Sequence, residues 1–442
     1  MRSDVLDKIR QAAVGLDGAV DIPDEVVELA GDASFVLLGE ATHGTHEFYQ
    51  CRAEITKRLI EEKGFAAVAV EADFPDAYRV NRFIRGSGDD KTAQESLRDF
   101  RRFPLWMWRN AAVLEFVEWM RSANGKRKFD DRVGFYGIDL YSLHSSMQAV
   151  LSYLEKTDPE AAKRARYRYA CFEAFGEDPQ HYGYTASYDL SSSCEDEAVK
   201  QLVDLQRRAA DYMNRDGFVA RDEYFFAEQN ARLVKNAEEY YREMFRGRVS
   251  SWNLRDRHMT ETLIALADQL EKQGRPKKIV VWAHNSHLGD ARAADMGEQG
   301  EWNVGQLVRE NFPHETVNIG FTTYHGSVTA ATNWDEPAQL KKVRDGHPDS
   351  YERVFHDSGE SCFFLDLSKP TVAKALSTPM LERAIGVIYR PETERVSHYF
   401  YADLPRQFNA VIHFDRTKAV KPLDIVSSWT REDVPETYPE GV

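Results

Sequence analysis

The segment FVLLGEATHG, residues 35–44, joins a short apolar run to ionisable residues. Three further runs have the same form and end at Glu71, Asp139 and His284: Ala67–Val70, Val133–Ile138 and Lys278–Ala283. Short β-branched and aromatic runs between helical stretches are typical of buried parallel strands. Because ligand pockets of open α/β sheets lie outside the carboxyl ends of the strands, we expect these ionisable residues to converge at one edge of one sheet.

The alternation of strand and helix patterns predicts an α/β fold with a mostly parallel central sheet flanked by helices. Helices are expected over residues 45–62, over 74–85 and from Pro104 through Met120. From Tyr141 to Gln273 the apolar residues recur with a period of 3.6, which predicts a helical insertion. Strands are expected again at 278–282, 316–321, 362–365, 385–389 and 410–413. We therefore predict a first core segment (1–140), a helical insertion (141–275) and a segment that completes the core and adds a small α+β part (276–442).

Composition favours a cytoplasmic protein that acts on a small molecule. The 442-residue chain has a net charge of −15, which argues against nucleic acid or an anionic membrane as its main partner. The longest apolar runs are strand-sized, and the first residues lack the positive and apolar regions of a signal peptide. The four cysteines form no CxxC pair, so we expect reduced thiols. The oligomeric state is left open.

His43 is the strongest candidate for a general base. It is expected near the beginning of a helix, where a neutral imidazole is favoured and can accept a proton. Glu40 is placed to orient the ring, and Arg52 could pair with a carboxylate or bind a substrate oxyanion. The alternative is that these polar residues only cap the helix.

Glu71, His284 and His287 are the next candidates. A glutamate after four apolar residues needs a partner, which could be Arg52 or Arg79 in a structural salt bridge. As a functional group, Glu71 could instead position water, while either histidine could polarise a carbonyl or protonate a leaving alcohol. For Asp139, capping of the next helix is the favoured interpretation.

Two aromatic and basic clusters, residues 103–110 and 251–258, could form walls for a bulky apolar substrate. Their candidate substrate-binding residues are Trp106, Trp108, Arg109, Asn253 and Arg255. Helix packing with a buried ion pair is the alternative, and for Asp256 we favour pairing with a neighbouring arginine. The tyrosine-rich stretch 182–188 is a candidate lid.

Several common catalytic motifs are missing from the sequence: GxSxG, HExxH, the P-loop and GxGxxG. Their absence favours hydrolysis by activated water with neither a metal nor a cofactor. One alternative is a hydrolase in which the Glu and His cluster holds Zn, Mn or Fe. A third hypothesis is a protein that binds its ligand without turnover.

The motifs together resemble the erythromycin esterase family over nearly the whole chain. They are GEATHG with Arg52 and Glu71 downstream, FYGIDLYS, SWNLRDRHM, WAHNSHL and the stretch from Ser397-His398-Tyr399 to His413. The resemblance implies an α/β core with a helical insertion, and opening of a macrolide lactone, an antibiotic-resistance activity, without a covalent intermediate. It places the general base on His43 and other functional positions on Glu40, Arg52, Glu71, His284 and His287. His398, in the last of these motifs, is a further candidate substrate-binding residue. Some relatives are labelled succinoglycan biosynthesis proteins.

Overall fold

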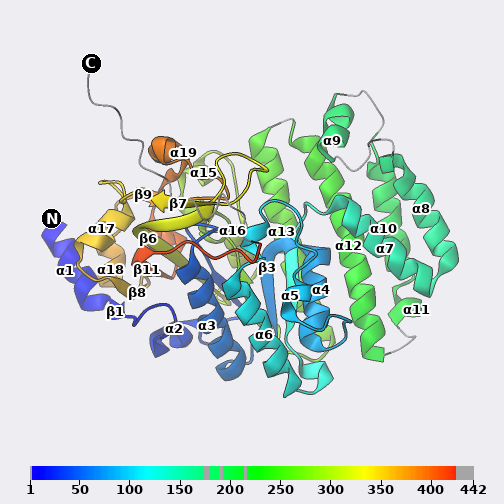
Figure 1. Ribbon diagram of the computed structural model, residues 1–442, viewed down its shortest axis with the longest axis horizontal. Coiled ribbons are helices and arrows are strands. Elements are labelled where there is room, and N and C mark those ends of the chain that lie inside the picture. The colour runs from blue at the N-terminus through cyan, green and yellow to red at the C-terminus, as the bar shows by residue number, and fades with distance from the viewer. Residues whose placement is uncertain are drawn as a thin grey trace.

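A computed structural model describes residues 2–173, 175, 179–188, 193–213, 217–245 and 247–424 of the chain. Its centre is a nine-stranded sheet made of β1 (Val14–Gly15), β2 (Phe35–Leu38), β3 (Ala67–Asp73), β4 (Gly134–Asp139), β5 (Ile279–Trp282), β6 (Thr316–Ala330), β7 (Gln339–Val343), β8 (Cys362–Asp366) and β11 (Ala410–Thr417). The order is β1-β8-β11-β6-β2-β5-β3-β4, with β7 paired to β6 (Figure 1). The path from β11 to β4 is parallel, whereas β1, β7 and β8 pair antiparallel. The predicted mostly parallel α/β sheet is confirmed.

The central strands are apolar along their whole length because helices cover both faces of the sheet. Alternate residues of β2 and β5 enter two different clusters: Leu38 and Trp282 pack on one face, Leu37 and Val281 on the other. The parallel register pairs Leu38 with Trp282, and Trp282 in turn with Val70. This register brings the carboxyl ends of β2, β5 and β3 side by side, and β4 follows at the edge.

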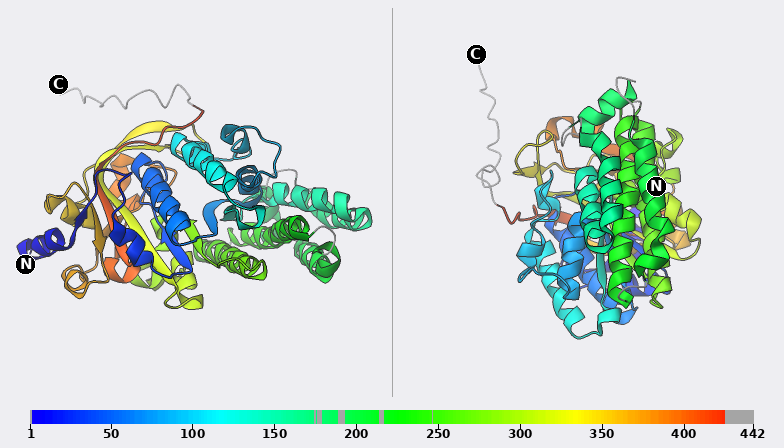
Figure 2. Two further views of the ribbon diagram at one scale, coloured as in Figure 1. Left: turned by 90° about the horizontal axis from the view of Figure 1, so that it is seen from below. Right: turned by 90° about the vertical axis from the view of Figure 1, so that its right-hand side faces the viewer.

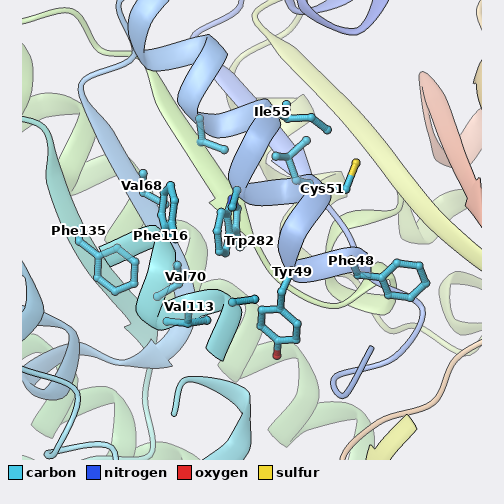
Figure 3. Close-up of a cluster of buried hydrophobic side chains, with 14 of the residues drawn as sticks. Phe48, Tyr49, Cys51, Ile55, Val68, Val70, Val113, Phe116, Phe135 and Trp282 are labelled. Carbon is cyan, nitrogen blue, oxygen red and sulfur yellow. The ribbon is translucent and has the colours of Figure 1, made fainter. Parts of the chain in front are cut away.

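One face is covered by α3 (His46–Glu62) and α6 (Ala111–Gly125). Figure 3 shows Trp282 of β5 between α3 and Phe116 of α6, with Ile55 and Val68 nearby. Helix α4 (Phe74–Arg85) has the predicted bounds and ends at Gly86, whose φ of 72° suits a glycine C-cap. The predicted start of the next helix at Pro104 is wrong, because residues Leu105–Met107 form a short 3-10 turn. The helix itself begins after Asn110, whose side chain accepts the amide of Val113.

The stretch between β4 and β5 is helical where the structure describes it, as expected. It comprises α7 (Leu143–Thr157), α8 (Pro159–Glu173), α9 (Pro179–Ser187), α10 (Glu195–Arg207), α11 (Ala209–Met213), α12 (Gly217–Glu243) and α13 (Arg248–Lys272). In Figures 1 and 2 these helices extend to the end of the molecule opposite the N-terminal α1 (Arg2–Ala12). The domain boundaries themselves stay predictions. No helix within the described ranges combines the length and apolarity that crossing a bilayer requires.

Two expectations about this helical part are corrected. Cys171 of α8 and Cys194, the N-cap of α10, form a disulfide, so only Cys51 and Cys362 are free thiols. The tyrosine-rich stretch lies largely in α9 and does not line the cleft described below, and the hydroxyl of its buried Tyr182 donates to Glu238. Its last residue, Tyr188, is the final described residue before a gap.

The C-terminal part adds a two-stranded sheet of β9 (Met380–Arg383) and β10 (Tyr399–Ala402). The predicted strand at 385–389 is wrong: Ile385 and Ile388 make only isolated bridges, to Thr42 and Ala331. The predicted strand at 316–321 continues to Ala330. The remaining helices are α2 (Asp24–Ala30), α5 (Ala93–Ser96), α14 (Asn285–Leu288), α15 (Asp295–Glu298), α16 (Val304–Asn311), α17 (Tyr351–Asp357), α18 (Pro370–Ala375), α19 (Glu394–Ser397) and α20 (Leu404–Gln407).

Candidate functional site

A cleft of about 380 Å³ lies at the carboxyl ends of the central strands. Seven of the residues considered from the sequence line it: His43, Glu71, Trp108, Asp139, Arg255, His284 and His287. They follow or end β2, β3, β4 and β5, or lie on α13, α14 and the segment before α6. The strand-end residues therefore converge where the parallel register requires.

Glu40 and His43 form a hydrogen-bonded pair directly after β2. His43 Nδ1 lies 2.8 Å from Glu40 Oε1, and Glu40 Oε2 accepts a hydrogen bond of 2.6 Å from Arg52 Nη2. Because the glutamate is paired with a guanidinium, it accepts the Nδ1 proton of His43 and leaves Nε2 of that ring with a free lone pair. Glycine is required at both ends of this turn: a Cβ at Gly39 would lie 2.1 Å from Asn285 Oδ1, and one at Gly44 would lie 1.8 Å from the carbonyl of Thr329.

Arg52 is fully buried beneath the cleft and does not line it. Its guanidinium lies over the rings of Tyr49 and Trp282, at 4.6 and 5.1 Å from their centroids, two rings that Figure 3 shows beside α3. The hydroxyl of Tyr49 donates to the carbonyl of His43 at 2.8 Å. Arg52 therefore holds the Glu40–His43 pair from behind and is not placed to bind a substrate oxyanion.

Glu71 is held by two donors from other elements. The amide of His284 donates to Oε2 at 2.9 Å, and Arg255 Nη2 donates to Oε1 at 2.7 Å. Burial favours the neutral acid, but His287, His43 and Arg255 outweigh it and hold the pKa of Glu71 far below its usual range. The structural salt bridge expected with Arg52 or Arg79 is not formed, since Arg52 pairs with Glu40 and Arg79 pairs with Asp90 and Asp99.

Arg255 of α13 connects three of the strand-end groups. Besides Glu71, it donates from Nε and Nη2 to the two oxygens of Asp139 at 2.9 and 2.7 Å, and from Nη1 to His287 Nε2 at 3.0 Å. Burial favours protonation of Asp139, but Arg255 lowers its pKa below the usual value. The expectation that Asp139 caps the next helix is wrong, because Ser142 is the N-cap of α7.

His287 is oriented by Asp256, one residue along α13 from Arg255. Its Nδ1 lies 2.9 and 3.0 Å from the two Asp256 oxygens, and its ring stacks on Trp252 with centroids 4.5 Å apart. Although burial favours the neutral ring, the carboxylates of Asp256 and Glu71 raise the pKa of His287. The expected pairing of Asp256 with a neighbouring arginine is replaced by this histidine contact and by the amide of Val304.

His284 keeps a single ring proton, on a buried nitrogen. Burial and the neighbouring His43 lower the pKa of His284 to about 3, although the backbone of Ala41 acts in the opposite direction. Its Nδ1 accepts the amide of Ser286 at 3.2 Å, which leaves the proton on Nε2, and Nε2 is buried without a hydrogen bond of normal geometry. The ring lies 4.8 Å from that of His43, centroid to centroid.

The predicted substrate-binding residues are brought together only in part. Trp108 and Arg255 line the cleft. Four others do not line it: Trp106 packs on Phe103, Arg109 pairs with Asp424, Asn253 bonds Gly300 and Trp302, and His398 packs on Tyr389. Trp252, from the 251–258 cluster, also lines the cleft. Sequence reasoning did not single out several other lining residues: Asp73, Asp76, Phe100, Arg102, Ser286 and Trp334. Arg102 directly precedes a cluster that was noted, but nothing local marked Asp73 or Asp76.

Within the described ranges, no group of three or more His, Cys, Asp or Glu side chains has a geometry that would hold a metal ion. The reason is visible in the contacts, since guanidinium groups already occupy the carboxylates. Arg52 binds Glu40, and Arg255 binds both Glu71 and Asp139. The donor set therefore does not fit a divalent cation.

Known proteins share this fold and sequence pattern. Erythromycin esterase type II of Escherichia coli is 22% identical over 404 residues, covering 85% of this chain and 93% of that protein. YbfO of Bacillus subtilis (strain 168), provisionally named a hydrolase, is 25% identical over 349 residues, covering 75% of this chain and 73% of its own. A crystal structure titled succinoglycan biosynthesis protein superimposes with a TM-score of 0.77 at 20% identity, covering 95% of this chain and 98% of that one.

A solved erythromycin esterase variant in its open conformation has a TM-score of 0.65 at 16% identity, covering 91% of this chain and 95% of its own. The family model described as erythromycin esterase matches residues 60–417, a range that includes Glu71, Arg255, His284 and His287 and begins after Glu40 and His43. The match spans most of the chain. This chain therefore belongs to the erythromycin esterase family and is a hydrolase homologue.

Proposed function

We propose that the protein hydrolyses a carboxylic ester or lactone, of the kind opened by macrolide esterases, with water activated by His43 and without a covalent intermediate. The observation that carries this proposal is the Glu40–His43 pair at the cleft. Glu40 fixes the tautomer by taking the Nδ1 proton, so Nε2 of His43 can accept a proton from water. Arg52 holds Glu40 in place through its hydrogen bond to Oε2.

The reaction has two steps. His43 Nε2 removes a proton from water while the water oxygen bonds to the ester carbonyl carbon, which forms a tetrahedral oxyanion. The Nε2 proton of His284, which lines the cleft and lacks a hydrogen bond of normal geometry in the protein, then hydrogen-bonds that oxyanion in the bound state. The carbon–oxygen bond to the alcohol then breaks, and the proton held by His43 passes to the leaving oxygen.

The Arg255 network supports this arrangement without reacting. Glu71 fixes the backbone of His284 through its amide, and Arg255 holds Glu71. Because Arg255 also binds Asp139, the ends of β3 and β4 are tied to α13. These groups act as positioning residues for the two histidines.

Ser286 is the one residue of the lining that could suggest a covalent mechanism. Its hydroxyl lies 2.8 Å from His284 Nδ1. A pKa of about 3 makes His284 a poor base at neutral pH, and no described carboxylate hydrogen-bonds its other ring nitrogen. The serine therefore lacks the base that a nucleophile requires.

A mass-spectrometric assay tests the proposal. Purified wild-type protein and the His43→Ala variant are incubated with 14- to 16-membered macrolide lactones and with simple aryl esters, and the masses of the products are measured. We expect the wild type to add one water to a substrate and the variant to leave the same substrate unchanged. The mass of the intact protein is measured after rapid quenching. A covalent adduct that carries the whole lactone, or the acyl group of an aryl ester, would overturn the mechanism. If His43→Ala turns over the substrate as fast as wild type, His43 has no part in the mechanism.

A further inference from the structure

Two aspartates of the cleft lining, Asp73 and Asp76, have no role in the proposed hydrolysis. Asp73 is the last residue of β3, Asp76 lies in the first turn of α4, and both line the cleft. Asp73 is only 7% exposed. Its Oδ2 accepts a hydrogen bond of 2.7 Å from Arg102 Nε.

The other oxygen of Asp73 has no partner. Oδ1 is buried and accepts no hydrogen bond. An aspartate at a helix N-cap usually accepts a backbone amide of the first turn, but Asp73 makes no such bond, and Pro75 has no N–H to donate. Because a buried carboxylate oxygen with neither a donor nor a cation beside it is costly, this position favours a cationic or N–H group that comes from outside the protein.

The cleft lining holds more carboxylates than guanidinium groups. Its charged side chains, apart from the histidines, are Glu71, Asp73, Asp76 and Asp139 against Arg102 and Arg255. Arg255 is engaged by Glu71 and Asp139. Of the two arginines, this leaves Arg102, whose side chain is 48% exposed, to balance Asp73 and Asp76. Burial and the neighbouring Asp73 and Asp99 raise the pKa of Asp76 to about 8, which is the response of a carboxyl group that lacks a cation.

Aromatic rings line the same cleft. Phe103 follows Arg102 in the chain and packs on Trp334 with ring centroids 4.9 Å apart. Trp334 is 57% exposed, although a large apolar ring is usually covered. Aromatic faces attract cations, and rings combined with carboxylates are a common way to bind quaternary ammonium groups.

We infer that the part of the cleft lined by Asp73 and Asp76 is a subsite for a positively charged amine or quaternary ammonium group of the substrate. Asp73 and Asp76 supply the charge by being ionised when the cation is bound, and Phe103 and Trp334 supply an aromatic wall. The inference rests on the proposed function and narrows its substrate class to esters or lactones that carry a basic nitrogen. The charged group would lie beside Asp73 and Asp76 while the ester carbonyl lies at His43 and His284.

Two alcohols of the same shape test the subsite without turnover. Choline and 3,3-dimethylbutan-1-ol differ by a quaternary nitrogen in place of a carbon, so their binding difference reports the charge. Calorimetric titration is performed with wild type, Asp73→Asn, Asp76→Asn and His43→Ala. Asp130→Asn removes an exposed carboxylate outside the cleft and serves as the charge-matched control. Circular dichroism verifies folding of each variant.

Choline is expected to bind wild type about tenfold more tightly than the neutral alcohol. Each of Asp73→Asn and Asp76→Asn should remove most of this preference, whereas His43→Ala and Asp130→Asn keep it. If Asp73→Asn does not fold, Asp76→Asn is sufficient. Equal affinity of wild type for the two alcohols, or an unchanged preference in the folded aspartate variants, would overturn the subsite. Choline selectivity in a protein that hydrolyses no ester would support the subsite and refute the proposed function.

Discussion

The imidazoles of His43 and His284 face each other across the cleft, 4.8 Å apart, in opposite hydrogen-bonding states. His43 gives its Nδ1 proton to Glu40 and keeps Nε2 as an acceptor. His284 accepts at Nδ1 from the amide of Ser286 and keeps its proton on Nε2. A ring nitrogen that can accept a proton and an N–H donor are thus held side by side, which is the arrangement that the proposed water attack on a carbonyl needs.

His43→Ala is expected to lower kcat by about 10³-fold, because it removes the base and leaves Glu40 paired with Arg52. The melting temperature should change little, because the buried Glu40–Arg52 pair is kept. The control is His46→Ala at the beginning of α3, where the histidine is half-buried and does not line the cleft. Comparable losses in both variants would show that the effect is structural. Initial rates of ester hydrolysis and a thermal melt give both readouts.

Glu40→Gln should lower both activity and stability. It leaves the Arg52 guanidinium buried without its carboxylate, a loss of about 3–5 kcal/mol in the free energy of unfolding. The double variant Glu40→Gln/Arg52→Met removes both charges and should recover much of the stability but none of the activity. Urea unfolding of the two single variants and the double variant measures the coupling. If the losses of unfolding free energy in the two single variants add up to the loss in the double variant, Glu40 and Arg52 have no coupling energy.

Ser286→Ala should keep kcat within about threefold of wild type if water is the nucleophile. The hydroxyl contacts His284 Nδ1, but the amide of the same residue still donates to that nitrogen in the variant. Rapid-quench kinetics on the aryl ester measures the first turnover. A burst of alcohol in wild type that disappears in Ser286→Ala would contradict direct water attack.

The strand-end residues could be predicted because each follows a short, wholly buried run. Trp282 and Leu38 lie in neighbouring strands in the register that parallel pairing requires, so His284 and Glu40 had to follow at the same edge. The bounds of α4 could likewise be predicted, since the apolar spacing and Gly86 mark its end locally. In these elements the local pattern and the tertiary structure agree.

Contacts made by long-range packing could not be predicted. Arg255 and Asp256 lie in a helix whose sequence looks like ordinary packing, and only the docking of α13 against β4 shows that they hold Asp139 and His287. Residues 385–389 are apolar enough for a strand, yet Ile385 pairs with a single residue of the turn after β2. The pairing of Cys171 with Cys194 depends on how α8 and α10 meet. The periodicity of apolar residues along the sequence reveals none of these contacts.

Asp256→Asn should reduce kcat by about 10- to 100-fold through loss of the His287 orientation. Because Asp256 raises the pKa of His287, the variant should also lower that pKa, which NMR titration of the histidine would detect. The raised pKa of the folded state adds stability below the unfolded pKa of His287, and this contribution is lost as the pH rises through the folded pKa. The variant should therefore lose more stability at pH 6 than at pH 8. If the pKa of His287 is the same in the variant as in wild type, and the stability of both falls equally with pH, Asp256 has a purely structural role.

Asp76→Asn should change how stability depends on pH. The pKa of Asp76 is about 8 in the folded protein against 3.8 for an unperturbed aspartate, so the folded state binds the extra proton between these values. Wild-type stability should therefore fall as the pH rises from about 4 to about 8. The groups that act on this carboxyl are Asp73, Asp99, Arg101 and Arg102.

The asparagine of the Asp76→Asn variant binds no such proton. The free energy of unfolding of the variant should therefore exceed that of wild type by about 1–3 kcal/mol at pH 8.5 and match it more closely at pH 5. Urea unfolding at both pH values measures this, with Asp130→Asn as the exposed control. A difference independent of pH would mean that Asp76 is ionised in the free protein and already has a cation beside it.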